Sequence, residues 1–284
     1  MKILFITDTH FGGKDLTGYH QQPRYPEQIE ELLFNLDAIV REESVNLIIH
    51  GGDLTDNATP LEINRSAKMY SKHLSCPVFL ALGNHDCLVE DCCERFLQYG
   101  SYFFPTNSCD STLVFDDVRI DILSINWAPN SKYWKLEDGA LPSLSEEHLT
   151  RLSSGNQDLP RVIVLHSNIR PKEILKDNIS TLTHHPNNDF DKIGDMLIEK
   201  FQPKLILTGH NHLNQLHKIN NTIAISASSF VETPFECKVI DITKEKLSIK
   251  TIALADRLSF KGEYYPDKEY VQGTKAEREY EQYF

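Results

Sequence analysis

The chain has 284 residues, enough for one large α/β domain or two small ones. Hydrophobic residues make up 40% and charged residues 25%, an ordinary composition for a soluble globular protein. The formal net charge of −12 repels a phosphate backbone, so a non-specific nucleic-acid binder is disfavoured. A small phosphorylated substrate stays compatible with this charge, because bound cations can reverse the local potential.

The six cysteines show no Cys-x-x-Cys spacing. An apolar strand-like run begins at residue 2, which leaves no room for a signal peptide, and no apolar run reaches the roughly 20 residues that a membrane span needs. We therefore expect a cytoplasmic protein with no membrane partner. In that compartment the cysteines, including the adjacent Cys92 and Cys93, are expected to be thiols.

The N-terminal third alternates strands with amphipathic helices. Strands are predicted at residues 2–7, 47–50 and 78–82, and helices at 27–43 and 61–74. This βαβαβ order predicts a parallel sheet with right-handed crossovers. A Gly- and Pro-rich loop at 11–26 follows the first strand, and His20 in it is either solvated or a substrate contact.

The middle of the chain is less regular. We expect a short helix at 90–99, a hairpin at 111–125, a helix at 143–152, a strand at 161–165, a helix at 189–201 and a strand at 204–208. Trp127 and Trp134 are candidates for either core packing or a pocket wall, with the core favoured for Trp134. His184 and His185 lie in a polar loop and are either solvated or substrate contacts.

The C-terminal part begins with four short strands, at 215–219, 222–226, 238–242 and 247–254, which predict a second, mainly antiparallel sheet. We place a catalytic domain at residues 1–255 and a charged tail with five tyrosines at 256–284. The last eleven residues are compatible with a short helix. The tail either packs on the domain or contacts a second subunit in a homodimer.

Five predicted strands each end in a residue that can bind a metal ion. These candidate ligands are Asp8, His10, Asp53, Asn84, His166, His210 and His212. Seven ligands exceed the three or four that a single zinc ion needs and suit two ions about 3.5–4 Å apart, with one bridging carboxylate. Mixed imidazole and carboxylate ligation favours two divalent or trivalent ions such as Mn, Fe or Zn.

The motifs Asp8-x-His10, Gly52-Asp53, Gly83-Asn84-His85-Asp86, His166 and Gly209-His210-x-His212 occur in this order. Together they resemble the signature of the calcineurin-like metallophosphoesterases, and most closely that of the class III cyclic-nucleotide phosphodiesterases. Members of that branch often carry a second histidine after the one at 166, whereas Ser167 stands here.

The resemblance implies a fold and a ligand set. The fold would be an α/β, four-layer αββα sandwich of two mixed β-sheets flanked by helices. Asp8, His10, Asp53 and His212 would hold one metal ion, and Asp53, Asn84, His166 and His210 would hold the other, with Asp53 as the bridge.

The expected activity is hydrolysis of a small phosphodiester, with a cyclic nucleotide as one possible substrate. A hydroxide bridging the two ions would attack phosphorus, and His85, which is not needed as a ligand, would protonate the leaving group as general acid. Asp86 would orient the ring of His85. A phosphomonoesterase or nucleotide pyrophosphatase is the alternative, and a nuclease or a non-catalytic scaffold is less favoured.

Overall fold

The computed structural model describes residues 1–14, 22–127, 142–169 and 188–284. The strands in this part are β1 (Lys2–Ile6), β2 (Leu47–His50), β3 (Val78–Leu80), β4 (Ser111–Val114), β5 (Arg119–Ile122), β6 (Arg161–Val164), β7 (Leu205–Thr208), β8 (Gln215–Ile219), β9 (Thr222–Ser226), β10 (Glu236–Ile242), β11 (Lys246–Ala253) and β12 (Glu279–Tyr283). The helices are α1 (Ile29–Glu42), α2 (Pro60–His73), α3 (Cys92–Tyr99), α4 (Glu146–Ser153), α5 (Asn188–Phe201) and α6 (Lys275–Arg278).

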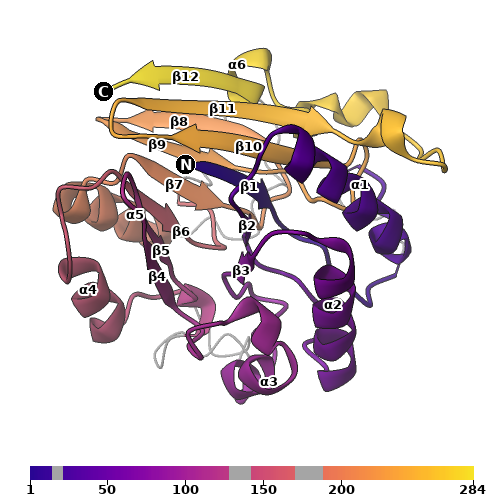
Figure 1. Ribbon diagram of the computed structural model, residues 1–284, viewed down its shortest axis with the longest axis horizontal. Helices are drawn as coiled ribbons and strands as arrows, with labels where there is room; N and C mark the ends of the chain where they lie inside the picture. Colours follow the sequence, from indigo (N-terminus) through magenta and orange to yellow (C-terminus); the bar gives the residue numbers. More distant parts are fainter. Residues whose placement is uncertain (15–21, 128–141, 170–187) are drawn as a thin grey trace.

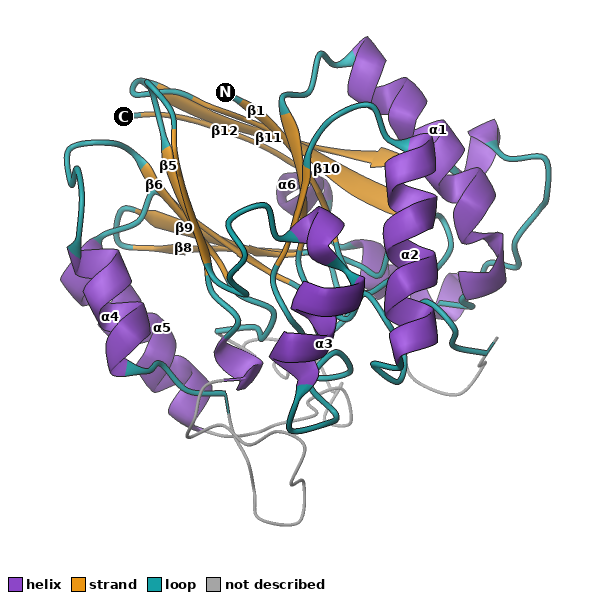
Figure 2. Cartoon of the chain, turned by 60° about the horizontal axis from the view of Figure 1, so that its bottom comes forward, coloured by secondary structure: helices purple, strands orange, loops and turns teal. Residues whose placement is uncertain are grey.

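Two six-stranded mixed sheets form the centre of the molecule (Figure 1). The first has the order β12-β11-β10-β1-β2-β3, and the second β4-β5-β6-β7-β9-β8. Helices α1, α2 and α3 cover the outer face of the first sheet, and α4 and α5 cover that of the second (Figure 2). The expected four-layer αββα sandwich is therefore confirmed.

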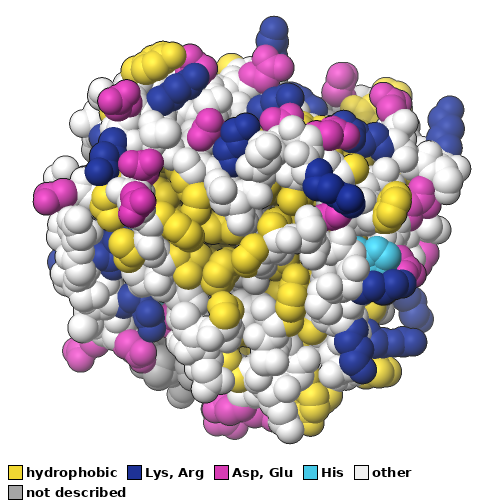
Figure 3. Space-filling view, in the orientation of Figure 1, with side chains coloured by type: hydrophobic (Ala, Val, Ile, Leu, Met, Phe, Trp, Pro, Cys, Tyr) yellow, Lys and Arg dark blue, Asp and Glu magenta, His cyan; other side chains and the backbone are white. Residues whose placement is uncertain are grey.

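Three buried clusters of apolar side chains hold the layers together. Successive side chains of a strand point to opposite faces, so Ile3 and Phe5 of β1 pack between the sheets, whereas Leu4 and Ile6 pack beneath α1 and α2. On the face of the molecule seen in Figure 1, hydrophobic side chains gather near the middle and charged ones lie mostly around the rim (Figure 3). A third cluster, which includes Leu197 of α5, lies between the second sheet and its helices. Strands covered on both faces must be apolar throughout, which explains their uninterrupted hydrophobic runs.

The four strands after residue 214 do not form a sheet of their own, so that expectation is wrong. β8 and β9 extend the second sheet, where β9 runs parallel to β7, and β10 and β11 extend the first, where β10 pairs antiparallel with β1. Strand periodicity reports which face is buried but not which neighbour a strand pairs with.

The tail packs on the chain's own domain. Its helix α6 has four residues, and β12 then pairs antiparallel with β11, with Ile249 opposite Tyr280. Val271 is fully buried, and its carbonyl oxygen accepts a hydrogen bond from the backbone N–H of Asn214. The predicted helix over the last eleven residues therefore covers only the first part of that segment.

Cys93 and Cys109 form a disulfide, so the expectation that all six cysteines are thiols is wrong. Their Cα atoms lie 6.2 Å apart because α3 and the segment before β4 pack against each other. Cys76, Cys87, Cys92 and Cys237 are free. Within the described residues, none of the helices combines the length and apolarity needed to cross a membrane.

Candidate metal centre

The predicted ligands lie where the carboxyl ends of strands from both sheets meet. β1 and β2 run parallel, as do β6 and β7, so the segments that follow them emerge at the same edge. The backbone N–H of Asp8 donates to the carbonyl of Gly52 at 2.9 Å, and that of Gly209 donates to the carbonyl of His166 at 2.8 Å. The N–H of His210 donates to Asp8 Oδ2 at 3.1 Å, which joins the two sheets.

Two motif glycines allow these segments to approach each other. A Cβ atom on Gly83 would collide with the carboxylate and backbone of Asp53, and one on Gly209 would collide with the side chains of Thr7 and Asp8. The glycines are therefore needed for close approach of backbone to side chain.

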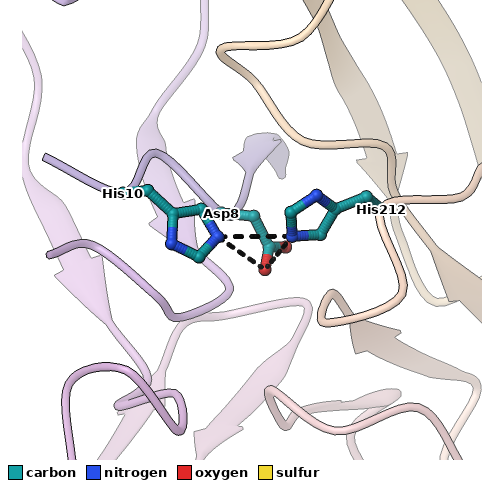
Figure 4. Close-up of side chains that lie close together, drawn as sticks. All are labelled: Asp8, His10 and His212. Atoms are coloured by element: carbon teal, nitrogen blue, oxygen red, sulfur yellow. Dashed lines mark hydrogen bonds and ion pairs between the residues drawn. The ribbon is translucent and has the colours of Figure 1, made fainter. Parts of the chain in front are cut away.

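Asp8, His10 and His212 form the first cluster (Figure 4). The Nε2 atoms of the two histidines face each other across 3.3 Å. Asp8 Oδ1 lies 3.2 Å from His212 Nε2 and 4.0 Å from His10 Nε2. All three residues are buried, so one carboxylate and two imidazoles point at a common position shielded from water.

Asp53, His166 and His210 form the second cluster. Asp53 Oδ2 lies 3.2 Å from His166 Nε2, and the amide oxygen of Asn84 lies 3.1 Å from His166 Nε2 and 2.8 Å from His210 Nδ1. Nδ1 of His166 lies 2.8 Å from the carbonyl oxygen of Gly51. Because a carbonyl can only accept, that nitrogen carries a hydrogen, and Nε2, which faces Asp53, is the nitrogen that can bind a metal ion.

Asp53 lies between the two clusters. Besides its contact with His166, its Oδ2 lies 4.0 Å from His10 Nε2. Its Oδ1 accepts a hydrogen bond of 2.8 Å from the backbone N–H of His85. One carboxylate thus reaches toward both groups of imidazoles, which is the placement that a bridging ligand requires.

Five of the seven predicted ligands have left-handed backbone conformations. Their φ angles are 56° at Asp8, 43° at His10, 50° at Asp53, 72° at His210 and 55° at His212. For a residue with a Cβ this conformation costs about 1 kcal/mol or more, and it persists only where the surrounding structure enforces it. The conformation of these five residues therefore destabilises the fold, and it directs their side chains toward one place.

Carboxylates and imidazoles in the centre shift each other's pKa. Burial alone would raise the pKa of Asp8 and Asp53, but His212 and His166 respectively hold both well below the usual range. Burial alone would lower the pKa of the histidines. Instead Asp53 raises the pKa of His166 to about 9, and Glu232 with Asp8 raises that of His212 to about 10.

Without metal, protons on the imidazoles of His166 and His212 offset the negative charges of Asp8 and Asp53. A bound metal cation can take the place of these protons. Asp8 Oδ1 is also buried and accepts no hydrogen bond from the residues that the structure describes. A buried carboxylate oxygen beside two converging imidazole nitrogens suits a cation. The donor set therefore fits metal ions.

A family model described as calcineurin-like phosphoesterase matches residues 1–214, about three quarters of the chain. The chain belongs to this family. It is accordingly a metal-dependent phosphoesterase by membership. Comparison with curated protein sequences gives no match.

Solved structures share the fold of this phosphoesterase at low identity. A dimetal phosphatase from Danio rerio matches with a TM-score of 0.66 and 15% identity, over 89% of this chain and 96% of that one. GAP50, described as the anchor in the inner membrane complex of Plasmodium, matches with 0.60 and 13%, over 97% and 90%. TT1561 of Thermus thermophilus matches with 0.53 and 11%, over 89% and 98%.

His85 lies beside the first cluster of this phosphoesterase, and its side chain is 38% exposed. Its Nδ1 lies 2.9 Å from the carbonyl oxygen of Asp56 and 3.9 Å from the Oδ1 atom of the same residue. Its ring packs edge to face on that of His10, with centroids 4.7 Å apart. The ring is thus held in place on one side and open to solvent on another.

Asp86 does not orient His85, so that prediction is wrong. Its Oδ1 accepts hydrogen bonds from the backbone N–H and the hydroxyl of Thr55, and its Oδ2 accepts from the backbone N–H groups of Leu54 and Gly83. Burial raises the pKa of Asp86 to about 6 in spite of these bonds. Asp86 joins the segment that carries Asp53 to the segment that carries Asn84.

Sequence reasoning missed three charged residues around the phosphoesterase centre. Asp56 contacts His85 and also lies 3.3 Å from His10 Nδ1, and Glu232 Oε1 lies 2.6 Å from His212 Nδ1. Arg24 lies 3.7 Å from Asp56 Oδ1. Asp56 follows Asp53 by three residues, whereas Glu232 and Arg24 lie in irregular segments where no sequence pattern indicates a role for them.

The remaining residues singled out in the sequence say little about the site. Ser167 is buried and shares a hydrogen bond of 3.4 Å with Asn126. His20, Trp134, His184 and His185 lie outside the described residues.

Proposed function

We propose that this phosphoesterase hydrolyses a small phosphodiester at a binuclear metal centre, with cyclic nucleotides as the first substrate class to test. The observation that carries the proposal is the pair of ligand clusters joined by Asp53, with the half-exposed His85 at their side. A phosphoryl group bound there would meet both metal positions and the imidazole of His85.

Asp8, His10, Asp53 and His212 would hold one ion, and Asp53, Asn84, His166 and His210 would hold the other. The ions, when bound, would activate the attacking water and neutralise charge on the phosphoryl oxygens. Manganese, iron and zinc all suit the mixed imidazole, carboxylate and amide donors.

His85 would act as general acid. Its Nδ1 is engaged by the carbonyl of Asp56, so the ring cannot turn freely, and its other nitrogen is available to protonate a leaving alkoxide. The carboxylate of Asp56, 3.9 Å from Nδ1, supplies a negative charge next to the ring. Asp56 therefore takes the orienting role first assigned to Asp86.

The resemblance of the motifs to those of the class III cyclic-nucleotide phosphodiesterases supports a diester substrate over a monoester. A phosphomonoesterase or nucleotide pyrophosphatase is the alternative, because it would use the same ligands.

The deciding experiment compares hydrolysis of bis-p-nitrophenyl phosphate with that of p-nitrophenyl phosphate by Mn²⁺-loaded protein, before and after chelation. Faster diester turnover that the chelator abolishes supports the proposal and leads to a screen of cyclic nucleotides. Faster monoester turnover would overturn the diester preference in favour of a phosphatase. Turnover of neither substrate by metal-loaded protein would favour a non-catalytic scaffold.

A further inference from the structure

His212 of the first cluster and His166 of the second differ in the group that contacts their Nδ1 atom. Nδ1 of His212 lies 2.6 Å from a carboxylate oxygen of Glu232, whereas Nδ1 of His166 lies 2.8 Å from the backbone carbonyl of Gly51. The first acceptor is a carboxylate oxygen and the second is a neutral carbonyl oxygen. A carboxylate behind an imidazole makes the opposite nitrogen a stronger metal ligand.

The second histidine of the Asp8 cluster also has a carboxylate behind it. Asp56 Oδ1 lies 3.3 Å from Nδ1 of His10. Both imidazoles of the Asp8 cluster therefore back onto carboxylates (Figure 4 shows the side that faces the metal position). In the Asp53 cluster, His166 has a neutral carbonyl oxygen in the corresponding place.

The contacts of Glu232 are those expected of a carboxylate that positions the ring of His212. It is 3% exposed, and its Oε2 accepts no hydrogen bond from the described residues. Asp86, a buried carboxylate that joins two segments, has donors on both of its oxygens. Leaving Oε2 of Glu232 without a donor is costly, and positive charge on the far side of His212 would reduce this cost further than the charge of Arg24 already does.

We propose that Glu232 is a positioning residue that makes the two metal positions unequal, so that the position at Asp8, His10 and His212 fills first and holds its ion more tightly. The inference rests on the proposed binuclear centre and goes beyond it by ranking the two positions and naming the cause. The negative charge behind His212 attracts the ion, and the hydrogen bond fixes the tautomer that presents Nε2 to it.

The test is a Mn²⁺ titration of metal-free protein, followed by calorimetry and by metal analysis after dialysis. Wild-type protein should bind two ions with distinct affinities. In Glu232→Gln, which keeps the shape and removes the charge, the tighter class should weaken by about 10–100-fold while the weaker class changes little. The dissociation constants of the two metal positions should therefore become more similar in this variant.

Glu236→Gln is the matched control. Glu236 is as buried as Glu232 and lies four residues away, but it contacts Asn214, Ser228 and Arg278 and none of the predicted ligands. It should keep both affinity classes. If Glu232→Gln fails to fold, Glu232→Asp, which keeps the charge but withdraws it from Nδ1, should show a selective loss at the tighter position.

The outcomes separate the two proposals. Unchanged or equally reduced affinities at both positions in Glu232→Gln would overturn the role of Glu232 and leave the proposed function standing. A wild-type protein that binds no metal would overturn both. Selective weakening of the tighter class supports the inference even if the hydrolysis assay identifies a different ester.

Discussion

The Nε2 atoms of His10 and His212 lie 3.3 Å apart, although the two residues are separated by 202 positions and follow strands of different sheets. An ion bound by both rings would link the sheets. Metal binding should therefore stabilise the native fold, by about 2.7 kcal/mol when the free ion is at 100 times its dissociation constant. Thermal unfolding with Mn²⁺ and then with excess chelator measures this shift.

Two variants test whether these histidines are responsible. His212→Ala should lose most of the Mn²⁺-dependent rise in Tm. His73→Ala, which removes a histidine paired with Glu30 on the surface of α2, should keep it. Equal metal-dependent shifts in both variants would place the stabilising ion elsewhere.

Asp53→Asn should weaken both metal positions at once. The substitution keeps the shape of the side chain but removes the charge that faces both His10 and His166. Metal analysis of purified protein should give clearly fewer than two ions per chain. Asp110→Asn is the control, because Asp110 is a partly buried aspartate that pairs with His148 and contacts none of the predicted ligands, and it should keep two ions. Retention of two tightly bound ions by Asp53→Asn would contradict the bridging role.

His85→Ala should lower kcat by about 10²–10⁴-fold without loss of metal, because the general acid is removed while the backbone N–H that bonds Asp53 remains. The loss should be smaller for a substrate whose leaving group is already acidic, such as a nitrophenolate, than for one that leaves as an alkoxide. Loss of bound metal in this variant would show instead that His85 is a ligand.

The strand-end pattern predicted most of this site, and the reason is geometric. Parallel strands bring their carboxyl ends to one edge, so Asp8, Asp53 and Asn84 had to lie close together once the βαβαβ order was recognised. Convergence of His166 and His210 on the same place depended on the second sheet packing against the first. Their motif positions, more than their periodicity, indicated it.

What the sequence could not show was the set of contacts made by irregular segments. Glu232 reaches His212 from the segment between β9 and β10, and Cys109 reaches Cys93 across 16 positions, with no periodic signal in either case. Asp86 lies next to His85 in sequence, yet its carboxylate turns toward three backbone N–H groups instead. Adjacency in the chain was a poor guide to contact there.

The left-handed backbone at His210 leads to a prediction about stability. Because its φ is 72°, metal-free His210→Gly should be more stable than metal-free His210→Ala by about 1 kcal/mol, as only the Ala variant keeps a Cβ in a strained conformation. His166 lies outside the set of positive-φ residues, so there the Ala variant should be the more stable. Urea unfolding of the four proteins checks the reversal, and the same order at both positions would contradict it.

Lys238 of β10 gives a prediction about pH, remote from the metal centre. Burial lowers the pKa of its ammonium group to about 8, although Glu236 and Glu277 act in the opposite direction, and Arg278 adds to the decrease. Its only described hydrogen bond is to the hydroxyl of Thr251, at 3.0 Å. A lysine whose pKa is lower in the folded state than in the unfolded chain binds fewer protons when folded between pH 8 and its ordinary value near 10.5.

The free energy of unfolding should therefore carry a contribution from Lys238 that rises with pH across this window, by up to about 3 kcal/mol. Lys238→Met should be more stable than wild type near pH 7, where the buried charge is present, and its stability should depend less on pH between 8 and 10.5. Lys218→Met, an exposed change on β8, serves as the control and should leave the pH profile unaltered. Denaturant unfolding at several pH values measures all three proteins, and parallel profiles for wild type and Lys238→Met would show that the ammonium group is not destabilised in the fold.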